Sequence, residues 1–441
     1  MYKMFYLFLF MLLIYSQDSK SNDNIYTLTE FEIESINTFR ESDFSTFSDF
    51  TVINNLIESN FYSPDSEIHF GMYILCLAND DLDCANLHLN RAIQIDGKRN
   101  YYDLSDSLTV YKEFLKSAQR AVEKEKYNIG IEDYEKIIER FPERAAPYYG
   151  LGMVYKELKD RSAAIINLNK AISINPNKHS YAEAVFSIAQ TISSEADQDA
   201  RRQDYNSAIP KYLEAISYYP EFTQAYFQLA KSFYSLRDYK QAELYLLECL
   251  NLNQQQLQPL MMLASIFEKK RDADSAERYY RKAINVDSNS YKAHFRLGKL
   301  LMKKDLNSSR TSLQKAANLK NDYYYAHETL GIVNLQLGNK NEAIQNFKNT
   351  IDILGEKSSK RYKSLYLIAD IYNSKGEYKE ARDYALLAVD IKENGGAANF
   401  HLGIAYKNLG EKSRAKSAFQ RAIKDKDWRA SAKYEIDLLS K

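Results

Sequence analysis

The stretch Pro147-Tyr-Tyr-Gly-Leu-Gly-Met-Val-Tyr155 decides the fold of this 441-residue chain. The residues that complete its pattern follow directly: Ala163-Ala164, Leu168, Lys170-Ala171-Ile172 and Asn175-Pro176. A segment of about 34 residues with this pattern recurs from roughly residue 68 to residue 428. Self-similarity at this period is the signature of a stacked array of helical hairpins, in which each hairpin contacts only its neighbours. The period therefore predicts that function lies on an extended surface and not in a pocket of catalytic groups.

Small residues at fixed spacing explain how the two helices of one copy pack. A Gly or Ala in the first helix, such as Gly152, lets that helix approach the second helix closely. An Ala twelve residues later, such as Ala164, lies opposite for the same reason, and large residues three and four positions away fill the space around the contact. The last copy repeats the pattern with Leu402, Gly403, Tyr406, Gly410, Ala415, Phe419 and Ala422.

This pattern resembles that of the tetratricopeptide repeat family, which is W-x2-L-G-x2-Y, then A-x3-F, a second Ala and a Pro. Tyr148 stands where the family has Trp, and Leu151, Gly152 and Tyr155 follow at the family's spacing. The resemblance covers about four-fifths of the chain. It implies an all-α fold, a right-handed α-solenoid of stacked helix-turn-helix repeats.

The copies and the segments around them predict the domain organisation. Residues 17–65 fit the repeat poorly, and a stripe of apolar residues every three positions suggests helices that cap the array. At the other end, apolar residues on one side and charged residues on the other predict a polar capping helix. The expected organisation is a signal peptide at 1–16, a helical cap at 17–65, two divergent repeats at 66–142, eight repeats at 143–427 and a capping helix at 428–441.

The N-terminal segment has the features of a secretory signal. Lys3 precedes twelve apolar residues at 4–15, which as a helix reach about 18 Å, short of the roughly 30 Å hydrocarbon core of a bilayer. The run ends at Ser16, near which we expect cleavage. The prediction is export to the periplasm or cell envelope, with no integral span in the mature chain. A cytoplasmic protein, or one anchored by this segment, is the alternative, since Ile14 is bulky for a cleavage site.

The overall composition and charge balance bear on two kinds of partner. Apolar residues make up 45% and charged residues 27% of the chain, which is typical of a globular protein. The 59 basic residues balance the 59 acidic residues, so nucleic acid is not the expected ligand. The same balance gives no support for a polybasic anchor on a membrane surface.

The potentially reactive residues have structural interpretations. Cys249 occupies a position that most copies fill with a buried Ala. Cys76 and Cys84 lie on facing helices of one predicted hairpin, where we favour two small core thiols, with a disulfide as the alternative in an exported protein. His69, His294 and His327 fall in the Trp position and are interpreted as aromatic-sized fillers. Asp80-Asp81 is interpreted as part of an inter-repeat turn.

The sequence contains no common signature of an enzyme or of a metal site. It contains no G-x-G-x-x-G, G-x-x-x-x-G-K-[ST], H-E-x-x-H or G-x-S-x-G motif, and no C-x-x-C or Cys/His spacing of a metal site. We therefore expect a non-catalytic protein with no catalytic residue, metal or cofactor.

The candidate binding residues lie on the first helices, which in the resembling family line a concave groove. The position just after the Trp position forms an aromatic ladder, interrupted by Glu328: Tyr149, Phe186, Phe227, Met261, Phe295, Tyr366 and Phe400. Exposed apolar residues of this kind mark binding surfaces, although part of the ladder is family packing. Four basic residues are expected to converge near Phe227 and Phe295: Lys231, Lys292, Arg296 and Lys299. Such a cluster suits an extended peptide with acidic residues, or a C-terminal carboxylate.

One departure from the period marks a second candidate surface. Between Ala189 and Ala208 the chain has seven more residues than a copy requires, and these fall in residues 194–203. We expect them to lengthen both helices of this hairpin by about one turn each. The result is either a projecting contact site or a tolerated solvated insertion.

These features predict a scaffold that binds a partner protein segment in the groove of a helical solenoid. A periplasmic assembly factor or chaperone that holds its clients transiently is one alternative. A regulatory subunit of a cell-envelope enzyme is another.

Overall fold

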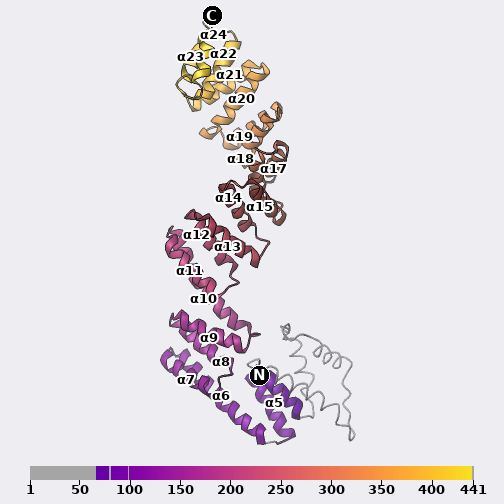
Figure 1. The fold of residues 1–441 in the computed structure, drawn as a ribbon, viewed down its shortest axis with the longest axis vertical. Helices are drawn as coiled ribbons and strands as arrows, with labels where there is room; N and C mark the ends of the chain where they lie inside the picture. The colour runs from indigo at the N-terminus through magenta and orange to yellow at the C-terminus, as the bar shows by residue number, and fades with distance from the viewer. Residues whose placement is uncertain (1–65, 79–80, 98, 440–441) are drawn as a thin grey trace, which may run out of the picture. The chain divides into compact units, whose positions relative to one another are not determined.

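The computed structural model describes residues 66–78, 81–97 and 99–439, and every regular element among them is a helix. Successive helices pair into antiparallel hairpins that follow one another along the chain (Figure 1). The chain divides into two compact units, residues 1–225 and 226–441, which are described separately. The predicted all-α solenoid of stacked hairpins is confirmed.

The described residues of the first unit form four hairpins. Each consists of a first helix and a second helix that pack against each other. The pairs are α4 (Ser66–Ala78) with α5 (Leu82–Ile95), α6 (Arg99–Glu123) with α7 (Tyr127–Arg140), α8 (Ala145–Glu157) with α9 (Arg161–Ile174), and α10 (His179–Arg201) with α11 (Tyr205–Tyr218).

The second unit continues the same arrangement. Helix α12 (Thr223–Ser235) begins in the first unit and packs through Ala230 against Ala242 and Leu246 of α13 (Tyr239–Leu252). The later pairs are α14 (Leu257–Lys269) with α15 (Ala273–Val286), α16 (Tyr291–Leu301) with α17 (Leu306–Leu319), α18 (Tyr324–Gln336) with α19 (Lys340–Leu354), α20 (Tyr362–Lys375) with α21 (Tyr378–Ile391), and α22 (Gly396–Asn408) with α23 (Lys412–Ala422). A short 3-10 turn (Ser359–Arg361) precedes α20, and α24 (Arg429–Leu439) ends the unit.

The close contact inside each hairpin lies where the sequence places small residues. A Cβ atom added to Gly152 of α8 would lie 2.8 Å from Cγ of Leu168 and 3.1 Å from the carbonyl oxygen of Ala164, both on α9. These distances leave no room for a larger side chain. The same close approach joins Gly298 to Leu313, Gly331 to Phe347 and Gly403 to Phe419.

Aspartate side chains start many of the second helices. Asp160, for example, accepts a hydrogen bond from the backbone N–H of Ala163 and so satisfies one of the unpaired donors in the first turn of α9. Asp81 does the same for α5 through the N–H of Cys84. It therefore lies in the turn within a hairpin, and the prediction that it lies in a turn between repeats is wrong. Equivalent caps are Asp204, Asp238, Asp272 and Asp305.

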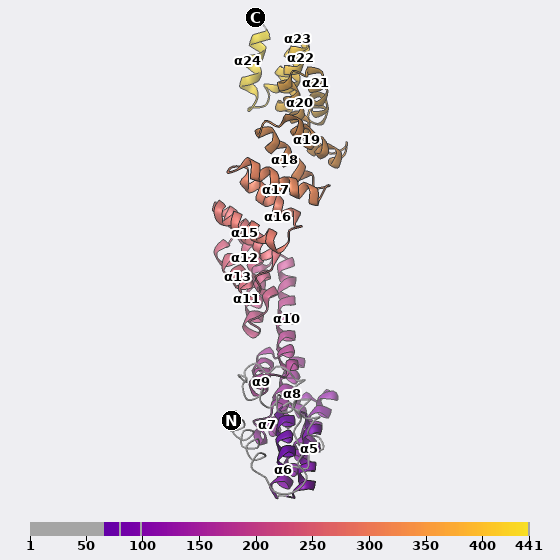
Figure 2. The same cartoon turned by 90° about the vertical axis from the view of Figure 1, so that its right-hand side faces the viewer.

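The seven-residue insertion lies entirely in the first helix of its hairpin. Helix α10 has 23 residues, whereas α11 has 14, the same length as α9 and α13 (Figure 2). The expectation that both helices lengthen is therefore wrong. Ala196 and Ala208 are fully buried and twelve residues apart, which is the spacing of Gly152 and Ala164, so Ala196 takes the small-residue position of this hairpin.

Side chains bind the added turns of α10 to their neighbours. The Tyr212 hydroxyl of α11 donates a 2.5 Å hydrogen bond to Asp197, and Lys211 pairs with Asp199 at 2.7 Å. Arg161 of α9 forms an ion pair with Glu195. The extension is thus packed and paired along its length, which favours a structural role over a free projection.

The two cysteines of the first hairpin form a disulfide. Cys76 of α4 and Cys84 of α5 have Cα atoms 5.6 Å apart, and their sulfurs are bonded. The favoured expectation of two separate thiols is therefore wrong, and the alternative is what the structure contains. Cys249 is buried and lies outside the disulfide, as expected; its Sγ lies 3.7 Å from Oε1 of Gln256, and burial raises its pKa to about 11.

Two sequence predictions concern residues 1–65, the signal peptide at 1–16 and the helical cap at 17–65. Both lie outside the described residues. Among the helices that are described, none combines the length and the apolar character needed to cross a membrane.

Candidate functional site

The residues of the aromatic ladder are half-buried and pack between consecutive repeats. In the first unit, the Tyr149 ring lies 4.8 Å from that of Tyr181, centroid to centroid. In the second unit, the Phe295 and Tyr323 rings meet edge to face at 5.2 Å. Ring contacts also join Phe186 to Phe222 and Phe400 to Trp428, with centroids 5.1 Å and 4.9 Å apart.

These contacts show that the ladder residues pack between repeats to a greater extent than the sequence predicted. In the first three pairs, the partner ring lies at or just before the start of the next first helix, four residues before the Trp position of that repeat, and Trp428 lies just before α24. Aromatic pairs at such distances contribute roughly 0.5–1.5 kcal/mol beyond the area they bury. The exposed edge of each ring is therefore what remains for a ligand, and contact between the ladder and a partner stays a prediction.

A concave pocket in the second unit brings part of the predicted site together. Its volume is about 380 Å³, and its walls come from α14, α15, α16 and the residue that precedes α18. Four predicted site residues line it: Met261, Lys292, Phe295 and Arg296. The other lining residues are Gln258, Met262, Ser265, Tyr280 and Tyr323. We call this the α14–α16 pocket.

The charged side of the α14–α16 pocket consists of two cations without an anion beside them. Lys292 and Arg296 are exposed and lie one turn apart on α16. Among the residues that the structure describes, no carboxylate lies within 4.0 Å of either side chain. Burial raises the pKa of Tyr323, and the positive charge of Arg296 acts in the opposite direction. Arg296 therefore directs positive potential into the pocket.

The apolar side of the pocket is firmly held. Phe295 packs against Tyr323 and against the clusters around Leu313 and Ala326. The Tyr280 hydroxyl donates a 2.8 Å hydrogen bond to Glu268, which fixes that ring on the pocket floor. The pocket thus combines an aromatic and thioether wall with two exposed cations.

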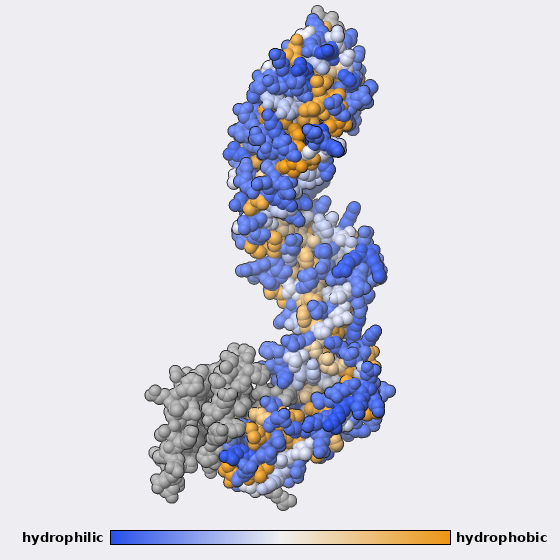
Figure 3. Space-filling view, turned by 180° about the vertical axis from the view of Figure 1, so that it is seen from behind, coloured by the Kyte–Doolittle hydropathy of each residue, from blue (hydrophilic) through white to orange (hydrophobic). Residues whose placement is uncertain are grey.

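The remaining predicted residues lie elsewhere. Phe227, Lys231 and Lys299 belong to the second unit but do not line the α14–α16 pocket, so the expected convergence of four basic residues is reduced to Lys292 and Arg296. Tyr366 packs beside Tyr362, and Phe400 packs beside Phe419. Tyr149 and Phe186 are in the first unit. Apolar residues interrupt the hydrophilic surface in both units (Figure 3).

Several pocket residues were missed as site residues. Gln258, Ser265 and Tyr323 received no functional interpretation from the sequence. A signal for Tyr323 existed: an aromatic residue stands four positions before the Trp position in several copies, as Tyr181, Phe222 and Tyr323. Gln258 and Ser265 lie on the groove face of α14 and carry no distinguishing pattern.

Two histidines in the Trp position stabilise the turns that precede their helices. Nε2 of His294 lies 3.1 Å from the carbonyl oxygen of Ser288, and Nε2 of His327 lies 3.0 Å from that of Asn321. Asn399, in the corresponding position of α22, donates to the carbonyl oxygen of Glu393 at 2.7 Å. Each side chain thus reaches back six residues, which agrees with the interpretation of these histidines as fillers with one polar edge.

Known protein families agree with this architecture. Models of the tetratricopeptide repeat family match residues 145–178, 194–252, 257–290, 362–394 and 397–425. The stacked hairpins and their first-helix face define a helical repeat protein that presents a protein-interaction surface. The chain contains tetratricopeptide repeats over these residues.

Several solved structures are similar to part of the chain. The crystal structure of MamA is 25% identical over 40% of this chain and 94% of MamA, with a TM-score of 0.36. YrrB, described as a TPR protein with an unusual peptide-binding site, is 16% identical over 43% of this chain and 97% of its own, with a TM-score of 0.38. The C-terminal part of a TPR repeat-containing protein from Cytophaga hutchinsonii is 15% identical over 55% and 98%, with a TM-score of 0.48. No protein with a curated description matches the chain significantly.

Proposed function

We propose that this chain is a non-catalytic scaffold that binds an extended segment of a partner protein on its first helices, with the α14–α16 pocket as the principal site. The observation that carries this proposal is the pairing of two cations that have no carboxylate partner among the described residues, Lys292 and Arg296, with the apolar wall of Met261 and Phe295 in one concavity. A pocket of this composition suits a ligand that is apolar at one point and anionic at the next.

The partner segment carries an acidic side chain or a C-terminal carboxylate. The guanidinium of Arg296 offers a fork of donors that matches a carboxylate, and Lys292 adds a second positive charge. Phe295 and Met261 accept an apolar side chain of the same segment. The segment binds in an extended conformation, because the lining residues come from successive repeats and not from one helix.

The apolar segment at residues 4–15 supports a location in the periplasm or cell envelope, where the partner is a component of an envelope complex. A periplasmic chaperone is the second candidate function. The half-buried aromatic residues along both units favour it, since several similar sites would hold unfolded clients weakly. Saturable binding of one segment supports the scaffold, whereas weak binding of many unrelated unfolded chains supports the chaperone.

The charge on α16 provides the test. Peptides rich in Asp and Glu are titrated against the purified chain, with peptides in which Asn and Gln replace them as the comparison. Exchanging both cations, in Lys292→Glu with Arg296→Glu, is expected to weaken binding of the acidic peptides about 30-fold, because each exposed charge pair contributes roughly 1 kcal/mol.

The matched control exchanges two exposed cations on the second helix of the same repeat, in Arg310→Glu with Lys315→Glu, and is expected to leave binding unchanged. Equal binding of acidic and amide peptides, or an equal loss in both double variants, contradicts the proposal. The circular dichroism spectra of all three proteins should coincide, since the four substituted side chains are exposed.

A further inference from the structure

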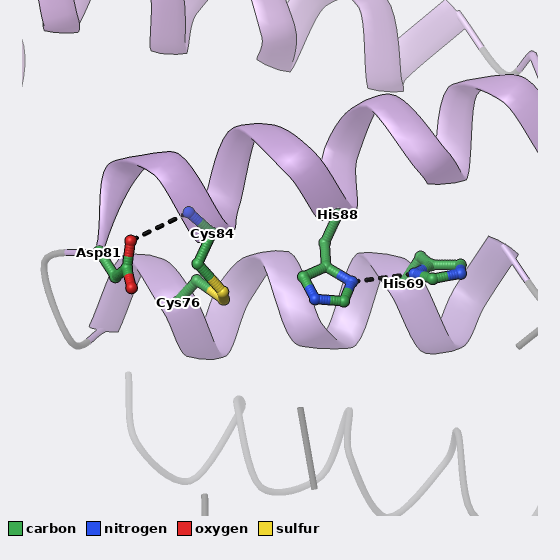
Figure 4. Close-up of a disulfide and its surroundings, with 5 residues drawn as sticks. All are labelled: His69, Cys76, Asp81, Cys84 and His88. Carbon is green, nitrogen blue, oxygen red and sulfur yellow. Dashed lines mark hydrogen bonds between the residues drawn. A yellow bond between two sulfur atoms is a disulfide. The ribbon is translucent and has the colours of Figure 1, made fainter. Parts of the chain in front are cut away.

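The first hairpin contains a cluster of sulfur and nitrogen ligands that the scaffold function does not use. Cys76 lies on α4, and Cys84 and His88 lie one turn apart on α5, so both point from the same face of that helix (Figure 4). One ligand atom of each residue lies within 4.8 Å of the other two. Cys76 and His88 are buried, whereas Cys84 is partly exposed and offers a path from solvent.

A second histidine orients His88. Nδ1 of His69 and Nδ1 of His88 lie 2.9 Å apart, with both side chains about 1% exposed. One of these nitrogens donates to the other, so the contact engages Nδ1 of His88 and assigns the ligand role to its Nε2. Figure 4 shows His88 lying between the cysteines and His69. Histidine ligands of metals commonly have their second nitrogen held in this way.

We propose that reduction of the Cys76–Cys84 disulfide converts this cluster into a site for one Zn²⁺, bound by the two thiolates and by Nε2 of His88. Thiolate and imidazole are the ligands that Zn²⁺ prefers, and three protein ligands leave a fourth tetrahedral position for water. The sequence conceals the site because its residues do not follow a C-x-x-C spacing. The facing helices bring them together instead.

A dithiol reductant supplies the electrons and protons that reduce the Cys76–Cys84 disulfide. The reductant transfers two electrons and two protons to the disulfide, which becomes two thiols, and the reductant itself becomes a cyclic disulfide. Zn²⁺ then displaces both thiol protons to the solvent. The oxidised hairpin and the metal-bound hairpin are therefore alternative states of the same residues, and metal affinity depends on the redox state of the chain.

Cobalt serves as the spectroscopic probe for this site. The full chain is reduced, freed of reductant without oxygen and titrated with Co²⁺. We expect one equivalent to bind, with a sulfur-to-cobalt charge-transfer band and the visible bands of tetrahedral cobalt, and Zn²⁺ to displace it. The oxidised chain is expected to show neither band. A reduced chain with native helicity that binds no Co²⁺ overturns the proposal.

Variants identify the ligands. Cys84→Ser is expected to abolish the charge-transfer band, and His88→Ala to weaken Zn²⁺ binding at least about 100-fold. His69→Ala should weaken binding roughly 10–100-fold while the charge-transfer band persists, because His69 positions the ligand and does not bind the metal. Cys249→Ser is the control for a cysteine outside the site and should bind like the original chain. Unchanged affinity in a helical His88→Ala protein overturns the assignment.

Discussion

Single residues set the distance between the two helices of a hairpin. At Gly152 even one added carbon would lie 2.8 Å from Leu168 Cγ, so the helices are as close as backbone and side chain allow. The sequence predicted this contact from spacing alone, because the small residue of the first helix and the Ala of the second helix recur at a fixed interval. The contact depends only on the geometry of two adjacent helices, and this geometry recurs in each hairpin.

Gly152→Leu is expected to lower the free energy of unfolding by about 1–3 kcal/mol, because the added side chain must displace Leu168 or separate α8 from α9. Urea denaturation followed by circular dichroism measures the change. Ser162→Leu introduces the same leucine side chain at an exposed position of α9, where it meets no clash, and is the control. Equal stability of the two variants contradicts the packing derived for this hairpin.

The histidines in the Trp position show which side-chain contacts the sequence could predict and which it could not. His294 and His327 were correctly interpreted as fillers, since their position in the repeat determines their surroundings. His69 occupies the same position, yet it lies against His88, which no repeat position predicted. The repeat period does not predict this contact, because the residue opposite His69 belongs to the second helix of a divergent repeat.

Aspartate caps in the first turns stabilise several of the second helices. Ser207 holds the Asp204 carboxylate through its hydroxyl and backbone N–H, and this lowers the pKa of Asp204. Ser275 lowers the pKa of Asp272, chiefly through its backbone N–H, and Ser308 lowers that of Asp305. Because the folded pKa lies below the unfolded one, each cap stabilises the fold fully above the unfolded pKa of about 3.9.

That stability is lost as the pH falls through the folded pKa, so the melting temperature should decrease as the pH is lowered below about 4. A triple variant, Asp204→Asn, Asp272→Asn and Asp305→Asn, keeps a capping oxygen but does not titrate. Its melting temperature should show a smaller decrease over the same range. Differential scanning calorimetry at a series of pH values makes the comparison. An identical pH profile in the variant refutes the capping contribution.

Element lengths show a second limit of the sequence. The size of the insertion between Ala189 and Ala208 was evident, but its placement was not, because a charged, helix-compatible segment extends either helix equally well. Pairing with α9 and α11 decides the matter in favour of α10, through Glu195, Asp197 and Asp199.

At the scale of the whole molecule, stability is distributed among neighbouring hairpins. In a repeat array, each hairpin is stabilised by its own packing and by its interfaces with the hairpins beside it. Gly403→Leu, which would force a side chain against Phe419, should therefore loosen α22 and α23 and, to a smaller extent, α20, α21 and α24. Hydrogen exchange read by mass spectrometry should show faster exchange there and unchanged exchange in α14–α17. Uniformly faster exchange across the second unit would contradict nearest-neighbour stabilisation.

The sequence by itself determined the repeat period and the pairing of helices into hairpins, because these follow from spacings within a few turns of helix. It also placed Met261, Lys292, Phe295 and Arg296 on first helices of the repeats. The tertiary structure decided which of the predicted residues meet in one pocket, since that depends on how successive repeats are stacked. It also brought Cys76, Cys84 and His88 together, because residues on two facing helices become neighbours only when the phase of each helix is fixed.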